Sequence, residues 1–278
     1  FDSVWMSEHH LTDDGLLPSP LIMAAAIAAR THRIRIGTNI IPLPLHHPLR
    51  IAEDAAVADL ISAGRMVLGL GQGYAKPEFA AFGADRRRRG SLLEEGIGIL
   101  RRAWTTDGRF SFAGEHWSFD EVQVTPRPRR PLPIYVGAVT EPALRRAARI
   151  ADGILVYCGK VSDLRARLGM IKNLGLELPV VATGILHVAP SAEQAWAEAA
   201  PGIAYLEGQI AKYGQRTHPE ELNRDDYLVG APGEVIEKLA ALRAEFDVDH
   251  FAHWARLPGL SHSRCTETLE LIAAELLA

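Results

Sequence analysis

Two adjacent histidines near the start of the chain stand where proton chemistry could take place. Glu8-His9-His10 follows a short apolar run, Ser3–Ser7, that predicts a β-strand. Because successive side chains of an extended backbone point to opposite sides, we expect only one imidazole to face a site at the strand end. Histidine exchanges protons near neutral pH, so one interpretation is a general acid or base and the other is a structural histidine bonded to the backbone.

A second histidine pair, His46-His47, precedes a helix that begins at Pro48. Adjacent histidines can indicate a metal site, but no second histidine four residues away and no nearby cysteine or aspartate completes a tetrahedral set. Cys158 and Cys265 are too far apart in the sequence to suggest a zinc knuckle, and two cysteines make no disulfide framework. The sequence therefore predicts no metal site.

Two glycine-containing turns could approach a ligand. Gly69-x-Gly71-x-Gly73 is part of a dinucleotide fingerprint without its last glycine or its following acidic residue, so ligand approach and tight packing remain equally open. Residues 137–140, Gly-Ala-Val-Thr, lie between a predicted strand and a helix that starts near Glu141. The free N–H groups of a helix start bind anions, although Thr140 could equally be an ordinary helix cap.

Arginines could supply positive charge beside that turn. Arg89 stands at the start of a predicted helix and ends the run 86–89, Arg-Arg-Arg-Arg. The chain carries 30 Lys+Arg against 34 Asp+Glu, a net charge of −4, and shows no other basic cluster. We therefore interpret the run as a solvated loop and expect no nucleic acid as a partner.

The order of predicted elements places these residues at strand ends. Apolar runs alternate with helical patterns, and most of them are continuous, as in parallel strands buried on both faces. The predicted strands are Ser3–Ser7, Arg33–Ile41, Met66–Gly71, Pro133–Gly137, Gly153–Tyr157, Pro179–Val188 and Asp249–Trp254. This α/β alternation fits an open doubly wound sheet or, as we favour, a (β/α)8 TIM barrel, whose chemistry lies where strands end.

Composition and length bound the class of protein. With 278 residues, 47% hydrophobic and 23% charged, the chain is globular, and we expect one domain over residues 1–278. The longest apolar run, Leu21–Ala29, is too short to span a bilayer, and no leader is visible. These features predict a cytoplasmic protein with no membrane partner. Seven strands after an abrupt start suggest that a first βα unit is missing from the chain as given.

Several long motifs in the same order resemble the bacterial luciferase family of flavin-dependent monooxygenases. The segments that carry the resemblance are FDSVWMSEHH (1–10), RIGTNIIPLPLHHPLRIAED (35–54), DLISAGRMVLGLGQG (59–73), EFAAFG (78–83) and PIYVGAVTEPALRRAARIADG (133–153). The resemblance implies a (β/α)8 barrel with an insertion near the seventh strand, here at residues 202–227. Phe1–Ser7 then corresponds to the second strand, in agreement with the seven-strand count.

The same resemblance implies a chemistry. Reduced FMN, supplied by a separate flavin reductase, would react with O2 to give a C4a-peroxyflavin that oxygenates a small organic substrate. His9 matches the family's active-site histidine and would be the catalytic proton donor or acceptor. Glu8 would either orient His9 or form a salt bridge with a neighbouring loop.

Residues for the cofactor follow in the same way. Asn39–Ile40 matches a non-proline cis peptide bond that backs the flavin ring. Gln72 stands where luciferase-like members carry an arginine, which weakens a charge argument but leaves a hydrogen-bond donor. The phosphate would be held by Arg89 together with the turn made of Gly137, Ala138, Val139 and Thr140.

Two other functions remain open. One is an oxidoreductase that uses coenzyme F420 on the same fold and transfers a hydride, although the Glu8-His9-His10 sequence fits the flavin branch better. The other is a non-catalytic flavin-binding relative. The family resemblance and the apolar helix Leu49–Ile61 also suggest a homodimer.

Overall fold

The structure, a computed structural model, describes residues 1–212 and 222–277. Contacts between Cα atoms divide the chain into two compact units. The first comprises Asp2–Ala138 and Pro142–Leu155, and the second comprises Phe1, Val139–Glu141 and Val156–Ala278. Each unit is described by itself below.

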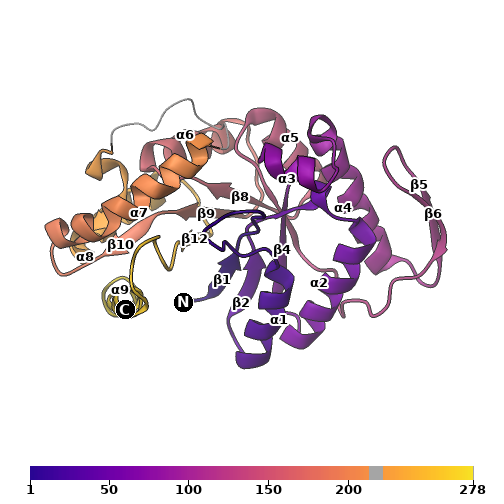
Figure 1. The fold of residues 1–278 in the computed structure, drawn as a ribbon, viewed down its shortest axis with the longest axis horizontal. Coiled ribbons are helices and arrows are strands. Elements are labelled where there is room, and N and C mark those ends of the chain that lie inside the picture. Colours follow the sequence, from indigo (N-terminus) through magenta and orange to yellow (C-terminus); the bar gives the residue numbers. More distant parts are fainter. Residues whose placement is uncertain (213–221, 278) are drawn as a thin grey trace. The chain divides into compact units, whose positions relative to one another are not determined.

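The first unit is built on a parallel sheet whose strands are paired in the order β1, β2, β4, β7 and β8. Figure 1 shows β1, β2 and β4 side by side. Their bounds are β1 Ser3–Met6, β2 Arg35–Thr38, β4 Met66–Gly71, β7 Ile134–Gly137 and β8 Gly153–Tyr157, with the short β3 Ile41–Pro42 paired to β4. β4 is buried along its whole length, as its apolar sequence predicts.

Helices follow these strands and alternate with them along the chain. They are α1 Pro20–Arg30, α2 Pro48–Ser62, α3 Lys76–Ala81, α4 Arg89–Thr105 and α5 Glu141–Ile150, with one-turn helices η1 Leu43–Leu45 and η2 Arg86–Arg88. α1 and α2 pack side by side (Figure 1), and proline occupies the first turn of both, where its missing N–H costs nothing. Between α4 and β7 the chain forms an antiparallel hairpin of β5 Phe110–Ala113 and β6 Ser118–Val122.

The second unit continues the alternation. Its elements are α6 Val161–Asn173, β9 Val180–Gly184, β10 Leu186–Val188, α7 Ala192–Lys212, η3 Arg224–Asp226, β11 Leu228–Gly230, α8 Pro232–Glu245, β12 His250–His253 and α9 His262–Glu275. β9 pairs in parallel with β12, and β10 pairs in parallel with β11. The predicted strand Pro179–Val188 is therefore two strands with different partners. Of the predicted insertion, residues 202–212 belong to α7 and residues 213–221 lie outside the described part of the chain.

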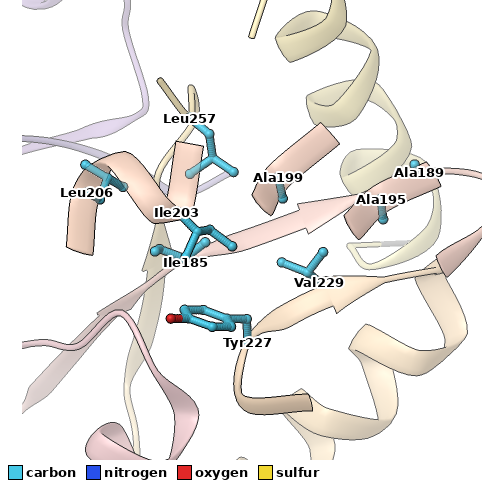
Figure 2. Packing of buried hydrophobic residues seen from close by; sticks show 9 residues of the cluster. All are labelled: Ile185, Ala189, Ala195, Ala199, Ile203, Leu206, Tyr227, Val229 and Leu257. Carbon is cyan, nitrogen blue, oxygen red and sulfur yellow. The ribbon is translucent and has the colours of Figure 1, made fainter. Parts of the chain in front are cut away.

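A hydrophobic cluster holds the second unit together. Its members come from α7, from the segments around β10 and β11, and from the segment between β12 and α9. Figure 2 shows them: Ile185, Ala189, Ala195, Ala199, Ile203, Leu206, Tyr227, Val229 and Leu257. The helix α7 runs without a break through Pro201, although proline usually ends or kinks a helix. Ala199 and Ile203, on either side of that proline, are fully buried, and this packing offsets the hydrogen bond that proline cannot donate.

The predicted α/β class and the count of seven parallel strands in βα repeats are confirmed, and the fold class is that of the (β/α)8 barrel. Five of these strands belong to the first unit and two to the second. No helix among the described residues combines the length and the hydropathy needed to cross a membrane.

One arginine of the first unit links the end of α1 to the end of α2 by hydrogen bonds. The guanidinium of Arg65 donates to five oxygen atoms at 2.7–3.0 Å, which belong to Ala28, Thr31 (twice), Ile34 and Ser62. Four of the acceptors are backbone carbonyls around the end of α1 and the end of α2. Arg65 is therefore a structural residue of this fold.

We expect Arg65→Ala to lower the free energy of unfolding by about 2–4 kcal/mol, because hydrogen bonds to a charged group are lost and carbonyls are left without a partner. Arg33, exposed near the start of β2, is the matched control, and Arg33→Ala should change stability by less than about 0.5 kcal/mol. Urea unfolding followed by circular dichroism measures both. Equal stability of the two variants would contradict the bracing role.

Candidate active site

The end of β1 is tied to a cis peptide bond. The bond between Asn39 and Ile40 is cis, as the family resemblance implied. The Asn39 amide donates to the Met6 carbonyl at 2.7 Å, and the Glu8 amide donates to the Ile40 carbonyl at 3.3 Å. These two bonds fix the cis peptide beside the residues that precede His9.

Glycines make room for this arrangement at the ends of β4 and β7. A Cβ on Gly69 would lie 1.7 Å from the Thr38 carbonyl oxygen, and one on Gly71 would lie 2.7 Å from Cδ1 of Ile40. On Gly137 it would lie 3.1 Å from Cγ2 of Ile40. The Ile40 side chain thus fills the space above two strand ends. Close packing, rather than ligand approach, accounts for the first two glycines of the Gly69-x-Gly71-x-Gly73 motif.

The imidazole of His9 faces a buried carboxylate. Its Nδ1 lies 3.6 Å from Oε1 of Glu78 on α3, and its ring meets the Tyr74 ring edge-on at 6.1 Å between centroids. The same carboxylate oxygen accepts the amide of His10 at 2.9 Å. Burial works against the charged form of Glu78, but the contacts with His9 and His10 outweigh it and hold its pKa below the usual value. Glu78 is thus an acceptor that can orient the His9 ring.

His10 points to a different carboxylate. Its Nε2 lies 2.7 Å from Oε1 of Glu8, and Nε2 of His46 lies 2.6 Å from the same oxygen. Glu8 therefore bonds a neighbouring loop, the second of the two roles predicted for it, and the orienting carboxylate of His9 is Glu78. His47, next in sequence to His46, instead accepts the Leu49 amide at 3.3 Å and caps α2. The two histidines of each pair therefore contact different groups: His9 contacts Glu78 and His10 contacts Glu8, while His46 contacts Glu8 and His47 caps α2.

A basic hollow of about 430 Å³ opens beside the loop that follows β4. Its polar lining consists of Gln72, Ser91 and the arginines Arg86, Arg87, Arg89 and Arg146. The structure thus brings together the two predicted cofactor residues Gln72 and Arg89. It adds Arg86 and Arg87, which the sequence suggested were only a solvated loop, and Arg146, which sequence reasoning missed. We call these six residues the basic hollow.

Positive charge in the basic hollow is only partly compensated. Nε of Arg146 lies 3.5 Å from Oε2 of Glu94. Arg88, which does not line the hollow, pairs with Glu115. Among the described residues, no ion pair is recorded for the other three arginines of the hollow, Arg86, Arg87 and Arg89. Burial, Arg86 and Arg146 together lower the pKa of Arg89. An anion bound here would relieve this repulsion.

The predicted phosphate turn is divided in the structure. The Ala138 amide donates to the Leu155 carbonyl at 3.1 Å, so this N–H is used within the sheet and is not available to a phosphate. Val139 and Thr140 are exposed, and Thr140 stands immediately before the first residue of α5. The prediction that the Ala138 amide donates to the phosphate is therefore wrong. Phosphate binding by Val139 and Thr140 stays a prediction.

The loop after β4 connects the hollow to the histidine. Gln72 lines the basic hollow and Tyr74 contacts the His9 ring, and two residues of chain span at most about 7 Å. The same short loop therefore borders both the hollow and the His9 ring. Glu78 lies in the EFAAFG segment and Arg146 in the segment 133–153, so both stand in motifs that carry the family resemblance, but nothing in the sequence assigned either a role.

The family profile of luciferase-like monooxygenases matches residues 1–250. The chain belongs to the luciferase-like monooxygenase family. The relatives named below are dehydrogenases and monooxygenases, which are both oxidoreductases. The activity of this chain is proposed in the next section.

Curated luciferase-like relatives fall into two groups. An F420-dependent glucose-6-phosphate dehydrogenase of Amycolatopsis mediterranei is 34% identical over 170 residues, 59% of this chain and 51% of the relative. The alkanal monooxygenase alpha chain of Photorhabdus luminescens is 32% identical over 180 residues, 64% of this chain and 50% of the relative. The chain thus spans about half the length of these relatives.

A solved luciferase-like structure agrees with the fold. The oxygenating constituent of 3,6-diketocamphane monooxygenase from Pseudomonas putida, in complex with FMN, superposes with a TM-score of 0.82 at 20% identity. The alignment covers 99% of this chain and 88% of that chain. At this level of identity the likeness concerns the fold alone.

Proposed function

We propose that the protein is an FMN-dependent monooxygenase that takes reduced FMN from a separate reductase and uses O2 to oxygenate a small organic substrate. The observation that carries the proposal is the basic hollow, joined by the short loop after β4 to the His9 imidazole. The relatives that match the chain include an alkanal monooxygenase, which supports the choice of a monooxygenase.

The residues fit such a cofactor. Arg89 and Arg146 would bind the phosphate through charge-assisted hydrogen bonds, with Gln72 and Ser91 as further donors. Ile40, held over the ends of β4 and β7 by the cis peptide, offers an apolar surface against which a flat ring can pack. When bound, reduced FMN would supply the electrons that activate O2.

His9 would move the proton. Glu78 faces Nδ1, which favours the tautomer that carries its proton there and leaves Nε2 to exchange a proton with the reacting oxygen or substrate. The buried position of Glu78 keeps the orienting charge close and poorly screened. In this assignment His9 is the catalytic residue and Glu78 is a positioning residue.

Use of F420 is the second candidate, because relatives such as the Amycolatopsis enzyme are F420-dependent glucose-6-phosphate dehydrogenases with comparable identity. The basic hollow would also accept the phosphate of that cofactor. In this case His9 would act in hydride transfer to or from a substrate carbon, and O2 would have no role.

Anaerobic binding and product analysis separate these candidates. We expect reduced FMN to bind at least about tenfold more tightly than reduced F420, measured by fluorescence titration. With reduced FMN and ¹⁸O₂, a panel of aldehydes, ketones and aromatic substrates should give a product that contains ¹⁸O, detected by mass spectrometry. Tighter F420 binding with hydride transfer to a substrate in the absence of O2 would overturn the proposal.

The predicted homodimer has support on the surface of the first unit. Large apolar side chains are exposed on α1, where Ile22 and Met23 stand, and on α2, where Val57 and Ile61 stand. Exposed apolar groups on two helices that pack side by side are typical of a surface that a protein partner covers. We propose that a second copy of the chain binds there.

A further inference from the structure

We propose that Glu8, His10 and His46 form a binding site for a divalent transition-metal ion of the zinc type. Their three ligand atoms, Oε1 of Glu8 and a ring nitrogen of each histidine, all lie within 4.8 Å of one another. Within the described part of the chain, no other set of three such groups comes this close. The site lies next to the proposed flavin chemistry but uses none of its residues.

The two distances from the imidazoles to Glu8 require only a small adjustment. Nε2 of His10 and Nε2 of His46 lie 2.7 and 2.6 Å from the same oxygen of Glu8. Zinc with tetrahedral bonds of about 2.0–2.1 Å separates its ligand atoms by about 3.3 Å, so each imidazole must withdraw by roughly 0.6 Å. Rotations of the side chains provide a movement of this size without moving the backbone.

The charge around the site favours a cation. Glu8 and Glu78 are both buried, each with 5% of the residue exposed. His10 contacts both carboxylates, because its amide donates to Glu78 and its Nε2 lies 2.7 Å from Oε1 of Glu8. In the described part of the chain, the ion pairs recorded for these two carboxylates are all with imidazoles, namely those of His9, His10 and His46. Neutral imidazoles leave two negative charges here, which a divalent ion would balance.

The ligand set fits a transition metal better than calcium or magnesium. Two imidazole nitrogens and one carboxylate oxygen are ligands of zinc and its first-row neighbours, whereas calcium and magnesium prefer oxygen alone. On binding, each neutral imidazole carries its proton on Nδ1 and turns the Nε2 lone pair to the ion. The side chains of His10 and His46 are 11% and 25% exposed, so an ion can enter and a water can complete the coordination.

The ligands are fixed from several directions. The Glu8 amide is bonded to the Ile40 carbonyl, and His46 ends the one-turn helix η1 with its amide bonded to the Leu43 carbonyl. The backbone on both sides of the site is therefore held before the ion arrives, which lowers the entropy cost of binding. The site could not be predicted from the sequence, because His46 is separated from Glu8 by 38 positions.

Metal binding to the untagged full chain tests the proposal without any flavin. After treatment with EDTA and removal of the chelator, Zn²⁺ is titrated in competition with a chromophoric chelator. We expect one ion per chain in the tight phase. His10→Gln and His46→Gln should each weaken binding at least tenfold, since loss of even an outer-shell partner costs about 10–100-fold.

Matched controls come from histidines outside the site. His47, adjacent to His46 but turned to the start of α2, and the exposed His32 should both be replaceable by alanine with less than a twofold change in Zn²⁺ affinity. Circular dichroism confirms that each variant is folded. Binding that is absent, or that weakens equally in His47→Ala, would overturn the proposal.

X-ray absorption of the zinc-loaded wild-type protein decides the question independently of any variant. We expect two imidazole ligands and one carboxylate oxygen in the first coordination shell. A shell with fewer than two imidazoles would contradict the site. None of these measurements depends on flavin binding or turnover, so the proposed function and the metal site stand or fall separately.

Discussion

His9→Ala should lower the rate of substrate oxygenation by about 100-fold or more, the scale that follows from losing a general acid or base. Oε1 of Glu78 lies 3.6 Å from Nδ1 of the His9 imidazole and orients it, and the ring lies edge-on to Tyr74. The measurement is product formation per enzyme under saturating reduced FMN and O2, with the substrate found by ¹⁸O incorporation. Added imidazole should restore part of the lost rate.

The controls for His9 separate chemistry from folding and binding. His32→Ala, at an exposed position, should leave turnover within a factor of two. The affinity for reduced FMN should change less than about threefold in His9→Ala, because the loss lies in proton transfer. If His9→Ala retains turnover above about a tenth of wild type, the catalytic assignment is wrong and a passive flavin-binding role for this residue gains support.

Removing two arginines from the basic hollow should abolish the preference for a phosphorylated flavin. Arg89→Ala combined with Arg146→Ala is expected to weaken FMN binding by at least about 100-fold, since each charge-assisted hydrogen bond contributes roughly 1.5–3 kcal/mol. Binding of riboflavin, which has no phosphate, should change less than about threefold. Fluorescence titration of both flavins into each protein measures the ratio.

Arg88 supplies the matched control for this experiment. It belongs to the same run of four arginines but pairs with Glu115 and does not line the hollow. Arg88→Ala should therefore leave FMN affinity within about twofold of wild type. Equal loss of FMN and riboflavin affinity in the double variant would show that the hollow does not bind the phosphate.

Several elements follow from local sequence rules. The helix predicted to start at Arg89 is α4, which begins at that residue, and the predicted strand Met66–Gly71 is β4 with the same bounds. Both depend on periodicity and on short-range terminating signals, which the chain carries in itself. The hairpin β5–β6 was not predicted, because its short strands depend on pairing with each other and Phe110 packs on Phe119 across them.

Errors arose where tertiary packing overrides a local signal. Pro201 predicts the end of a helix, but burial of the side chains around it keeps α7 continuous. The arginine run 86–89 indicates solvated charge by composition alone. Only the fold shows that three members of the run, all except Arg88, line a hollow together with Arg146 from α5.

The sequence by itself determined the βα repeat, the placement of His9, Asn39 and Gln72 at strand ends, and the family. Only the tertiary structure decided which side chains meet at these positions. His9 contacts Glu78, Glu8 contacts His46, and Arg146 lines the same hollow as Arg89. The physical reason is that parallel strands bring their carboxyl ends together from distant parts of the chain. Side-chain contacts made there are invisible to any rule that looks only at neighbours in sequence.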